Sequence, residues 1–265
     1  MTKKVTVSTL NQMKLSGEKI ACLTSYDASF AKLQDDAGID ALLIGDSLGM
    51  VLHGNNTTVH VTMDDMIYHT RLVSHVRQKA LIISDMPYQS YTSPDQAVKN
   101  AARLINEGGA DMVKLEGGKE MCEVIAAIKR NNIPVCGHLG LTPQSFKTSD
   151  LFRVHATTDE TAEKLKQDAL AIQEAGIDCL VFECIPSKVA KEVTEVLDVP
   201  TVGIGAGVDC DGQVLVLYDM LGITGKKFRF LKNFLEGNDS VLDAVKDYIK
   251  QVKDKSYPSA EHSFK

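Results

Sequence analysis

Three acidic residues stand where apolar runs of the sequence end. Asp46, Asp85 and Glu116 each follow a run that should be buried. If these runs are neighbouring parallel strands, the three carboxylates converge at one edge of the sheet and repel one another unless a cation joins them. Hard oxygen ligands without clustered His or Cys favour Mg²⁺. The sequence therefore predicts a Mg²⁺ site, against the alternative that each acid caps the following helix or pairs with a lysine.

Lys114 stands two residues before Glu116. In a strand, this spacing sends both side chains to the same face of the sheet. A buried lysine beside a metal site suits an anionic substrate. A Schiff-base role is also open, but it is less needed where a metal can polarise a carbonyl. The plainer alternative is an ion pair between Lys114 and an acid that holds the fold together.

Glu183 ends a later apolar run, and we expect it on the opposite side of the site from the three acids. A partly desolvated carboxylate has a raised pKa and can exchange a proton with a substrate, so Glu183 is the predicted general base. A helix cap or a surface acid is the alternative. His138, in CGHLGLT, either hydrogen-bonds the substrate or is structural, and Cys136 is assigned to the core.

The elements that must position these residues alternate between short apolar runs and longer amphipathic segments. The runs are too continuous for strands with one wet face, which is typical of a parallel sheet. Eight such runs separated by helices in about 250 residues favour a closed (β/α)₈ barrel over an open doubly wound sheet. The predicted strands are 20–25, 41–45, 81–84, 111–115, 133–137, 179–183, 200–204 and 214–218, and the predicted helices are 28–37, 62–76, 94–107, 120–130, 160–175 and 188–197.

Two further segments complete the predicted single domain of residues 1–265. Residues 8–14 precede the first strand and are expected to cover the bottom of the barrel, while the residues after about Leu231 form one or two closing helices. Related turns, AGID at 37–40, GGAD at 108–111 and AGID at 175–178, introduce three of the strands. Their glycines suit the left-handed conformation that ends a helix, and they are weak signs of a repeated βα unit.

Composition limits the class of protein further. The 265 residues carry 29 Lys and Arg against 35 Asp and Glu, a net charge of −6, and no basic run suits a nucleic-acid backbone. No segment is long and apolar enough for a signal peptide or a membrane span, so we expect a cytoplasmic protein with neither nucleic acid nor a membrane as partner. The six cysteines lack CxxC spacing and are interpreted as reduced core residues.

With these residues identified, the chain resembles the ketopantoate hydroxymethyltransferase family over nearly its whole length. GDSLGM, VKLEGG and GHLGLTPQS, in this order and at the family's spacing, are the most specific of the shared motifs. The full set is TSYDASFAKL at 24–33, LLIGDSLGM at 42–50, VTMDDMIYHT at 61–70, ADMVKLEGG at 110–118, PVCGHLGLTPQS at 134–145, GIGAGVDCDGQVLV at 203–216 and EHSF at 261–264.

The resemblance implies a barrel of the phosphoenolpyruvate/pyruvate superfamily. It also implies transfer of a hydroxymethyl group from 5,10-methylenetetrahydrofolate to 3-methyl-2-oxobutanoate in pantothenate biosynthesis, in a homodecamer of two pentameric rings. The implied site is Asp46, Asp85 and Glu116 for Mg²⁺, Asp46, Ser47, Asp85 and Lys114 for the keto acid, and Glu183 as the proton acceptor. The sequence departs from the family at 146–157, FKTSDLFRVHAT, in the loop expected to cover the site and to contact folate.

Two other functions stay open at this stage. A carbon–carbon lyase or mutase of the same superfamily would also bind a keto-acid enolate through Mg²⁺, and its Cys-Gly-His pattern would make Cys136 catalytic. The second alternative is a barrel without activity that serves as a binding or scaffold protein. Folate dependence separates the first alternative from hydroxymethyl transfer, and keto-acid proton exchange separates the second.

Overall fold

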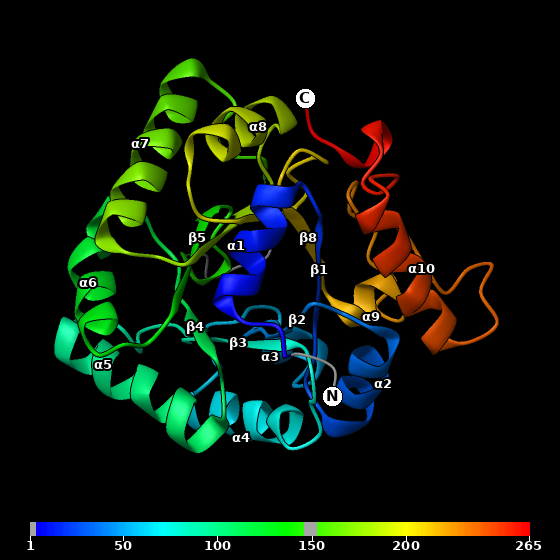
Figure 1. The fold of residues 1–265 in the computed structure, drawn as a ribbon, viewed down its shortest axis with the longest axis horizontal. Coiled ribbons are helices and arrows are strands. Elements are labelled where there is room, and N and C mark those ends of the chain that lie inside the picture. The colour runs from blue at the N-terminus through cyan, green and yellow to red at the C-terminus, as the bar shows by residue number, and fades with distance from the viewer. Residues whose placement is uncertain (1–3, 146–152) are drawn as a thin grey trace.

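The computed structural model describes residues 4–145 and 153–265 and has a closed barrel of parallel strands at its centre (Figure 1). The strands pair in chain order, and the ring closes where Ile20 of the first strand pairs with Gly212 of the last. The predicted (β/α)₈ barrel is confirmed. The strands are β1 Ile20–Thr24, β2 Ala41–Ile44, β3 Leu81–Asp85, β4 Met112–Lys114, β5 Val135–Gly140, β6 Cys179–Glu183, β7 Thr201–Ile204 and β8 Gly212–Leu215.

Helices surround the barrel (Figure 1), and several of them begin at a capping side chain. Asp27 accepts hydrogen bonds from the backbone N–H groups of Ser29 and Phe30, and Thr62 forms a capping box with Asp65. The α-helices are α1 Val7–Ser16, α2 Ala28–Ala37, α3 Leu48–Val51, α4 Met63–Ser74, α5 Pro94–Arg103, α6 Cys122–Arg130, α7 Asp159–Ala175, α8 Ser187–Val196, α9 Leu217–Met220 and α10 Val241–Lys253. Shorter helical turns are η1 Leu104–Gly108, η2 Lys119–Met121, η3 Pro143–Ser145 and η5 Ala260–His262.

Two strands differ from the prediction by more than one residue at an end. The fifth strand was predicted at 133–137 but is Val135–Gly140, because its backbone pairing continues past polar His138 until Gly140 pairs with Glu183. The last strand was predicted at 214–218 but is Gly212–Leu215, and Leu217–Met220 is helical. In both cases the apolar run marks buried side chains, whereas the hydrogen-bond register decides where the strand begins and ends.

Side chains alternate along the strands between two separate apolar layers. One layer lies between the sheet and the outer helices, and the other fills the barrel interior. Leu10 and Met13 of α1 pack into the interior layer, so α1 closes the end of the barrel where the strands begin (Figure 1). Cys22, Cys136 and Cys179 belong to this interior layer, and all six cysteines are free thiols, as the sequence led us to expect.

The strands are also tied together by a repeated polar contact at the closed end. An aspartate immediately before each even-numbered strand accepts a hydrogen bond from a backbone N–H at the start of the preceding odd-numbered strand, and a lysine approaches the same carboxylate. We call these contacts the aspartate clamps. They join Asp40 to Ala21 at 2.8 Å, Asp111 to Ile82 at 3.0 Å, Asp178 to Val135 at 2.8 Å and Asp211 to Thr201 at 2.9 Å. The lysines are Lys253, Lys4, Lys129 and Lys14 in the same order. The aspartates of the AGID and GGAD turns therefore each tie two neighbouring strands together at this end of the barrel.

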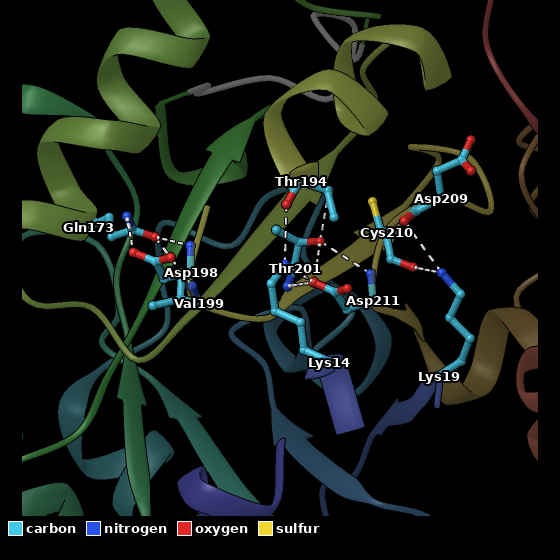
Figure 2. A network of polar contacts seen from close by, with 10 residues as sticks. All are labelled: Lys14, Lys19, Gln173, Thr194, Asp198, Val199, Thr201, Asp209, Cys210 and Asp211. Atoms are coloured by element: carbon cyan, nitrogen blue, oxygen red, sulfur yellow. Dashed lines mark hydrogen bonds and ion pairs between the residues drawn. The ribbon is translucent and has the colours of Figure 1, made fainter. Parts of the chain in front are cut away.

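The clamp at Asp211 also fixes α1 to the barrel (Figure 2). The carboxylate of Asp211 accepts hydrogen bonds from the Thr201 backbone N–H and from Lys14 Nζ at 2.8 Å. The backbone N–H of Asp211 donates in return to the Thr201 hydroxyl, and Lys14 Nζ also reaches the carbonyl oxygen of Thr194. One carboxylate thus joins the first helix to the last two strands.

This clamp can be tested by replacing Asp211 with alanine. Because hydrogen bonds to a charged group contribute about 1.5–3 kcal/mol each, we expect Asp211→Ala to lower the free energy of unfolding by about 2–3 kcal/mol, measured by urea unfolding. The control is Asp36→Ala, which breaks only the exposed i,i+4 pair with Lys32 and should change stability by less than about 0.5 kcal/mol. Equal losses in the two variants would contradict the clamp.

Candidate active site

A cavity of about 110 Å³ opens at the carboxyl ends of the strands, where barrel enzymes place their chemistry. Its lining contains every site residue that the sequence predicted, drawn from β2 through β6 and the loops that follow them. These residues are Asp46, Ser47, Asp85, Lys114, Glu116, His138 and Glu183. The structure therefore brings the predicted residues together, although they are spread over 138 positions of the chain from 46 to 183.

The three acids are buried and influence one another. Asp46 follows β2, Asp85 ends β3 and Glu116 follows β4, and each is less than a tenth exposed. The backbone N–H of Asp46 donates to Asp85 Oδ2 at 3.0 Å. Burial, together with repulsion from Asp85 and Glu116, raises the pKa of Asp46 well above its usual range. Burial also raises the pKa of Glu116 to about 8, with Asp85 adding to the effect and Lys114 opposing it.

Lys114 is the cation inside this group of acids. Its Nζ lies 2.7 Å from Asp85 Oδ1, and both side chains are buried. Burial by itself lowers the pKa of Lys114, but the attraction of Asp85, Glu116 and Asp46 outweighs burial and the pKa rises. A lysine held as an ammonium ion is not a nucleophile, which argues against the Schiff-base role. When all three carboxylates are ionised, they and the ammonium together carry two net negative charges, which is the charge that a divalent cation would balance.

The residues present fit a hard divalent cation. Glu116 Oε1 is buried without a hydrogen-bond donor, which is costly unless another group satisfies it. The acidic residues that line the cavity supply carboxylate oxygens, the ligand type of Mg²⁺. Among residues 4–145 and 153–265, however, no three His, Cys, Asp or Glu side chains already form a group that could hold a metal ion. The Mg²⁺ ligand set stays a prediction.

Gln144 is a site residue that the sequence analysis missed. It lies in the turn η3, and its side-chain amide donates to Asp46 Oδ2 at 2.8 Å and to the carbonyl oxygen of Met86 at 3.0 Å. Its backbone N–H donates to Glu116 Oε2 at 3.0 Å, and Tyr91 donates its hydroxyl proton to Gln144 Oε1. Gln144, which follows β5 in the chain, therefore holds two of the acids in position. In the sequence, only its place in the GHLGLTPQS motif pointed to a role in the site.

His138 lies between two carboxylates. Its Nδ1 is 3.3 Å from Glu116 Oε1, and its Nε2 is 3.3 Å from Glu183 Oε2. Burial and the charge of Lys114 lower the pKa of His138, so the imidazole is neutral at pH 7. A neutral imidazole carries one N–H and can donate to only one of its two neighbours at a time.

Glu183 ends β6, next to β5. Burial raises its pKa, and the contact with His138 opposes that rise. Gly140 pairs with Glu183, and a Cβ at Gly140 would collide with the Glu183 carbonyl oxygen, so this approach requires glycine. The imidazole of His138 therefore lies between Glu183 and Glu116. The sequence suggested a position for Glu183 on the opposite side of the barrel mouth from the acids, and in the structure it lies closer to them.

The remaining predicted residues have clear positions. The Ser47 hydroxyl lines the cavity and lies 2.8 Å from the Tyr26 hydroxyl, which holds it in place. Cys136 lies below the cavity in the barrel interior, where its hydrogen bond with Cys179 and burial raise the pKa of its thiol. Of the divergent loop 146–157, residues 146–152 lie outside the described part of the chain. His155 in the same loop donates its backbone N–H to the Cys184 carbonyl at 2.8 Å.

The fold and the site together define a class, the (β/α)₈ barrels with acidic residues at the strand ends. Solved structures with this fold include phosphonopyruvate hydrolase complexed with oxalate and Mg²⁺, with a TM-score of 0.62, 13% identity, and coverage of 79% of this chain and 80% of that one. Another is 2,3-dimethylmalate lyase, a PEP mutase/isocitrate lyase superfamily member, with a TM-score of 0.59, 15% identity, and coverage of 83% and 82%. At such identities the likeness concerns the fold alone.

Sequence comparison is more specific. The family model described as ketopantoate hydroxymethyltransferase matches residues 4–260. The 3-methyl-2-oxobutanoate hydroxymethyltransferase of Methylococcus capsulatus is 50% identical over 264 residues, covering 100% of this chain and 98% of the relative. That of Ruthia magnifica is 52% identical over 259 residues, covering 97% and 99%. The chain belongs to the ketopantoate hydroxymethyltransferase family, and the resemblance seen in its motifs is confirmed.

Across residues 4–145 and 153–265, no helix is both long and apolar enough to cross a membrane.

The role of Gln144 can be tested with Gln144→Met, which keeps the side-chain length and removes the amide. Asp46 Oδ2 and the Met86 carbonyl then lose a buried donor, and we expect a loss of about 1–3 kcal/mol in unfolding free energy. We also expect about a tenfold fall in hydroxymethyl transfer, because misplaced binding groups slow the reaction. The control is Gln167→Met on the exposed face of α7. Full activity in Gln144→Met would contradict the positioning role.

Proposed function

We propose that this chain transfers a hydroxymethyl group from 5,10-methylenetetrahydrofolate to 3-methyl-2-oxobutanoate, giving 2-dehydropantoate and tetrahydrofolate, with Mg²⁺ as cofactor. The observation that supports the proposal most directly is the buried group of Asp46, Asp85 and Glu116 around Lys114, with Glu183 on the same cavity. A role in pantothenate biosynthesis and decameric assembly are part of the same proposal and rest on the family resemblance.

The keto acid would bind where the acids and the ammonium meet. Asp46, Asp85 and Glu116 would hold Mg²⁺, which when bound polarises the 2-oxo group and the carboxylate of the substrate and stabilises the negative charge of an enolate. Lys114 would neutralise the remaining negative charge of the substrate. The Ser47 hydroxyl, held by Tyr26, can donate to the substrate carboxylate. Gln144 would keep two of the acids in position.

Glu183 would remove the proton on C3 of the keto acid. Its raised pKa makes the carboxylate a stronger base than an exposed glutamate. Once Glu183 carries the proton, its hydroxyl would face His138 Nε2, and the proton of the imidazole would then stand on Nδ1, on the side of Glu116. The neutral imidazole would thus accommodate both protonation states of Glu183 by changing its tautomer.

The carbon–carbon bond would form when the electron pair left on C3 attacks the methylene carbon of the folate. That methylene carbon is bonded to two folate nitrogens, and both bonds must break to release tetrahydrofolate. C3 of the keto acid replaces one nitrogen, and the oxygen of one water molecule replaces the other and becomes the new hydroxyl group. Each nitrogen receives one proton, one being the former C3 proton and the other coming from the water. Glu183 would return its proton in this stage and be ready for another cycle.

The lyase or mutase alternative finds less support. It requires a nucleophilic or acidic Cys136, but this thiol is fully buried in the barrel interior, and its pKa is raised well above the usual range. A thiol needs to be exposed and to have a lowered pKa to react. Cys136 is therefore better explained as a packing residue.

The proton transfer can be tested with Glu183→Gln. We expect exchange of the C3 proton of 3-methyl-2-oxobutanoate with D₂O to slow by at least about 100-fold, because a positioned general base contributes about that factor. Proton NMR measures the exchange, and titration calorimetry checks that the keto acid still binds. Glu192→Gln, on the exposed face of α8, is the control. Exchange at the wild-type rate would remove Glu183 from the role of base.

The metal site can be tested with Asp85→Asn, which keeps the shape of the side chain and removes one negative charge. We expect the Mg²⁺ concentration for half-maximal activity to rise about tenfold or more, because carboxylate charge dominates binding of hard cations. Removing divalent cations with a chelator should abolish transfer in the wild type, and added Mg²⁺ should restore it. Asp36→Asn on the surface is the control. An unchanged Mg²⁺ titration in Asp85→Asn would contradict the ligand set.

A further inference from the structure

A second cavity of about 260 Å³ opens beside the active site, and we call it the side cavity. It shares Glu183, Phe228 and Phe230 with the active-site cavity, so the two spaces meet at the predicted general base. The side cavity is lined by Arg153, Val154, Glu183, Cys184, Lys227, Phe228, Arg229, Phe230 and Phe264. A molecule lying in it would present one end to the reacting carbon of the keto acid.

Aromatic rings form one wall of the side cavity. Phe228 and Phe230 are stacked with their centroids 5.5 Å apart and their planes at 15°. Phe264 completes the wall, and its carbonyl oxygen accepts a hydrogen bond from the Ser187 N–H at 2.9 Å. Gly205 has a φ of 62°, and a Cβ there would lie 2.8 Å from the Phe230 ring and 3.1 Å from the Phe264 ring. The glycine therefore lets the rings pack closely. Such a wall suits a flat, unsaturated ligand.

Cations surround the opening of the side cavity. Arg153, Lys227 and Arg229 are exposed and line it. Within residues 4–145 and 153–265, none of the three forms an ion pair with a carboxylate, although the chain as a whole is negatively charged. The Arg229 Nε–H donates to the Glu261 carbonyl at 3.1 Å, which holds the guanidinium at the edge of the cavity. Three exposed cations beside a flat wall suit a ligand that carries several carboxylates.

The chain turns sharply where the two cavities meet. Cys184 has a φ of 51°, in the left-handed region, and its N–H donates to the Ile204 carbonyl at 2.9 Å. This turn allows Glu183 to line both cavities while Cys184 lines the side cavity alone. Glu183 would therefore act on a substrate in the first cavity while facing a ligand in the second.

We propose that the side cavity binds the folate co-substrate, with the pterin ring against Phe228 and Phe230 and the glutamate tail against Lys227, Arg229 and Arg153. This inference rests on the proposed function and adds the residues that hold the one-carbon donor. It also sets a specificity: because three cations face the tail, folates with several glutamates bind more tightly than the monoglutamate.

The first experiment uses the wild-type enzyme saturated with Mg²⁺ and compares tetrahydrofolate carrying one glutamate with tetrahydrofolate carrying three. We expect the triglutamate to bind about fivefold more tightly, since one exposed ion pair contributes up to about that factor. The difference should shrink when the salt concentration rises from about 50 to about 500 mM, because exposed charges are then screened. Equal affinities at low salt would overturn the assignment of the tail.

The second experiment separates the ring from the tail. We expect Lys227→Glu to raise the Kd of the triglutamate about tenfold through loss of attraction and added repulsion, and to leave the Kd of tetrahydropterin, which has no tail, unchanged. Phe228→Ala should weaken both ligands. Lys99→Glu makes the same charge change on the exposed face of α5 and should alter neither Kd. A Kd for the triglutamate in Lys227→Glu equal to that of Lys99→Glu would contradict the proposal.

Failure of this inference can be distinguished from failure of the proposed function. The C3 proton exchange of the keto acid in D₂O is measured in the wild type without folate, and product formation is measured with folate. If the wild type shows both proton exchange and product formation while Lys227→Glu and Phe228→Ala bind folates as the wild type does, the side-cavity assignment is wrong and the proposed function stands. If the folded wild type shows neither proton exchange nor product formation, the proposed function itself is wrong. Thermal unfolding of each variant confirms that it is folded.

Discussion

Uncompensated negative charge at the open end of the barrel is the constraint on which the site depends. Asp46, Asp85 and Glu116 are buried within reach of one ammonium group, and burying like charges together is unfavourable unless something neutralises them. Burial and mutual repulsion raise the pKa values of Asp46 and Glu116, and the attraction of the acids holds Lys114 in its charged form. A divalent cation that binds together with an anionic substrate reduces the repulsion between the acids. This repulsion therefore favours binding of both.

Much of this arrangement could be predicted from the sequence, because strands that follow one another in the chain are neighbours in the barrel. Once the apolar runs are identified as consecutive parallel strands, the residue that ends each run must lie on one rim. The residues predicted in this way all line the cavity at that rim, namely Asp46, Asp85, Lys114, Glu116, His138 and Glu183. The strand ends are less predictable, since Val135–Gly140 continues through a polar residue that an apolar run excludes.

Other features depend on contacts that spacing does not reveal. Gln144 is uncharged and lies in a turn, and its importance comes from meeting Asp46, which is far away in the chain. The side cavity brings together the loop at Arg153, the end of β6, the segment at Phe228 and the C-terminal Phe264. None of these segments contains a recognisable ligand motif by itself. Only the folded chain shows that their rings and cations face one space beside Glu183.

The aspartate clamps couple the strands in twos, β1 with β2, β3 with β4, β5 with β6 and β7 with β8. Among residues 4–145 and 153–265, no clamp of this kind joins one of these strand pairs to the next. Glu116 follows the second pair and Glu183 ends the third, while Gln144 hydrogen-bonds from the loop after β5 to Glu116 and Asp46. A shift between the second and third pairs would therefore change the separation of the acids from the base, and the hydrogen bonds of Gln144 oppose such a shift.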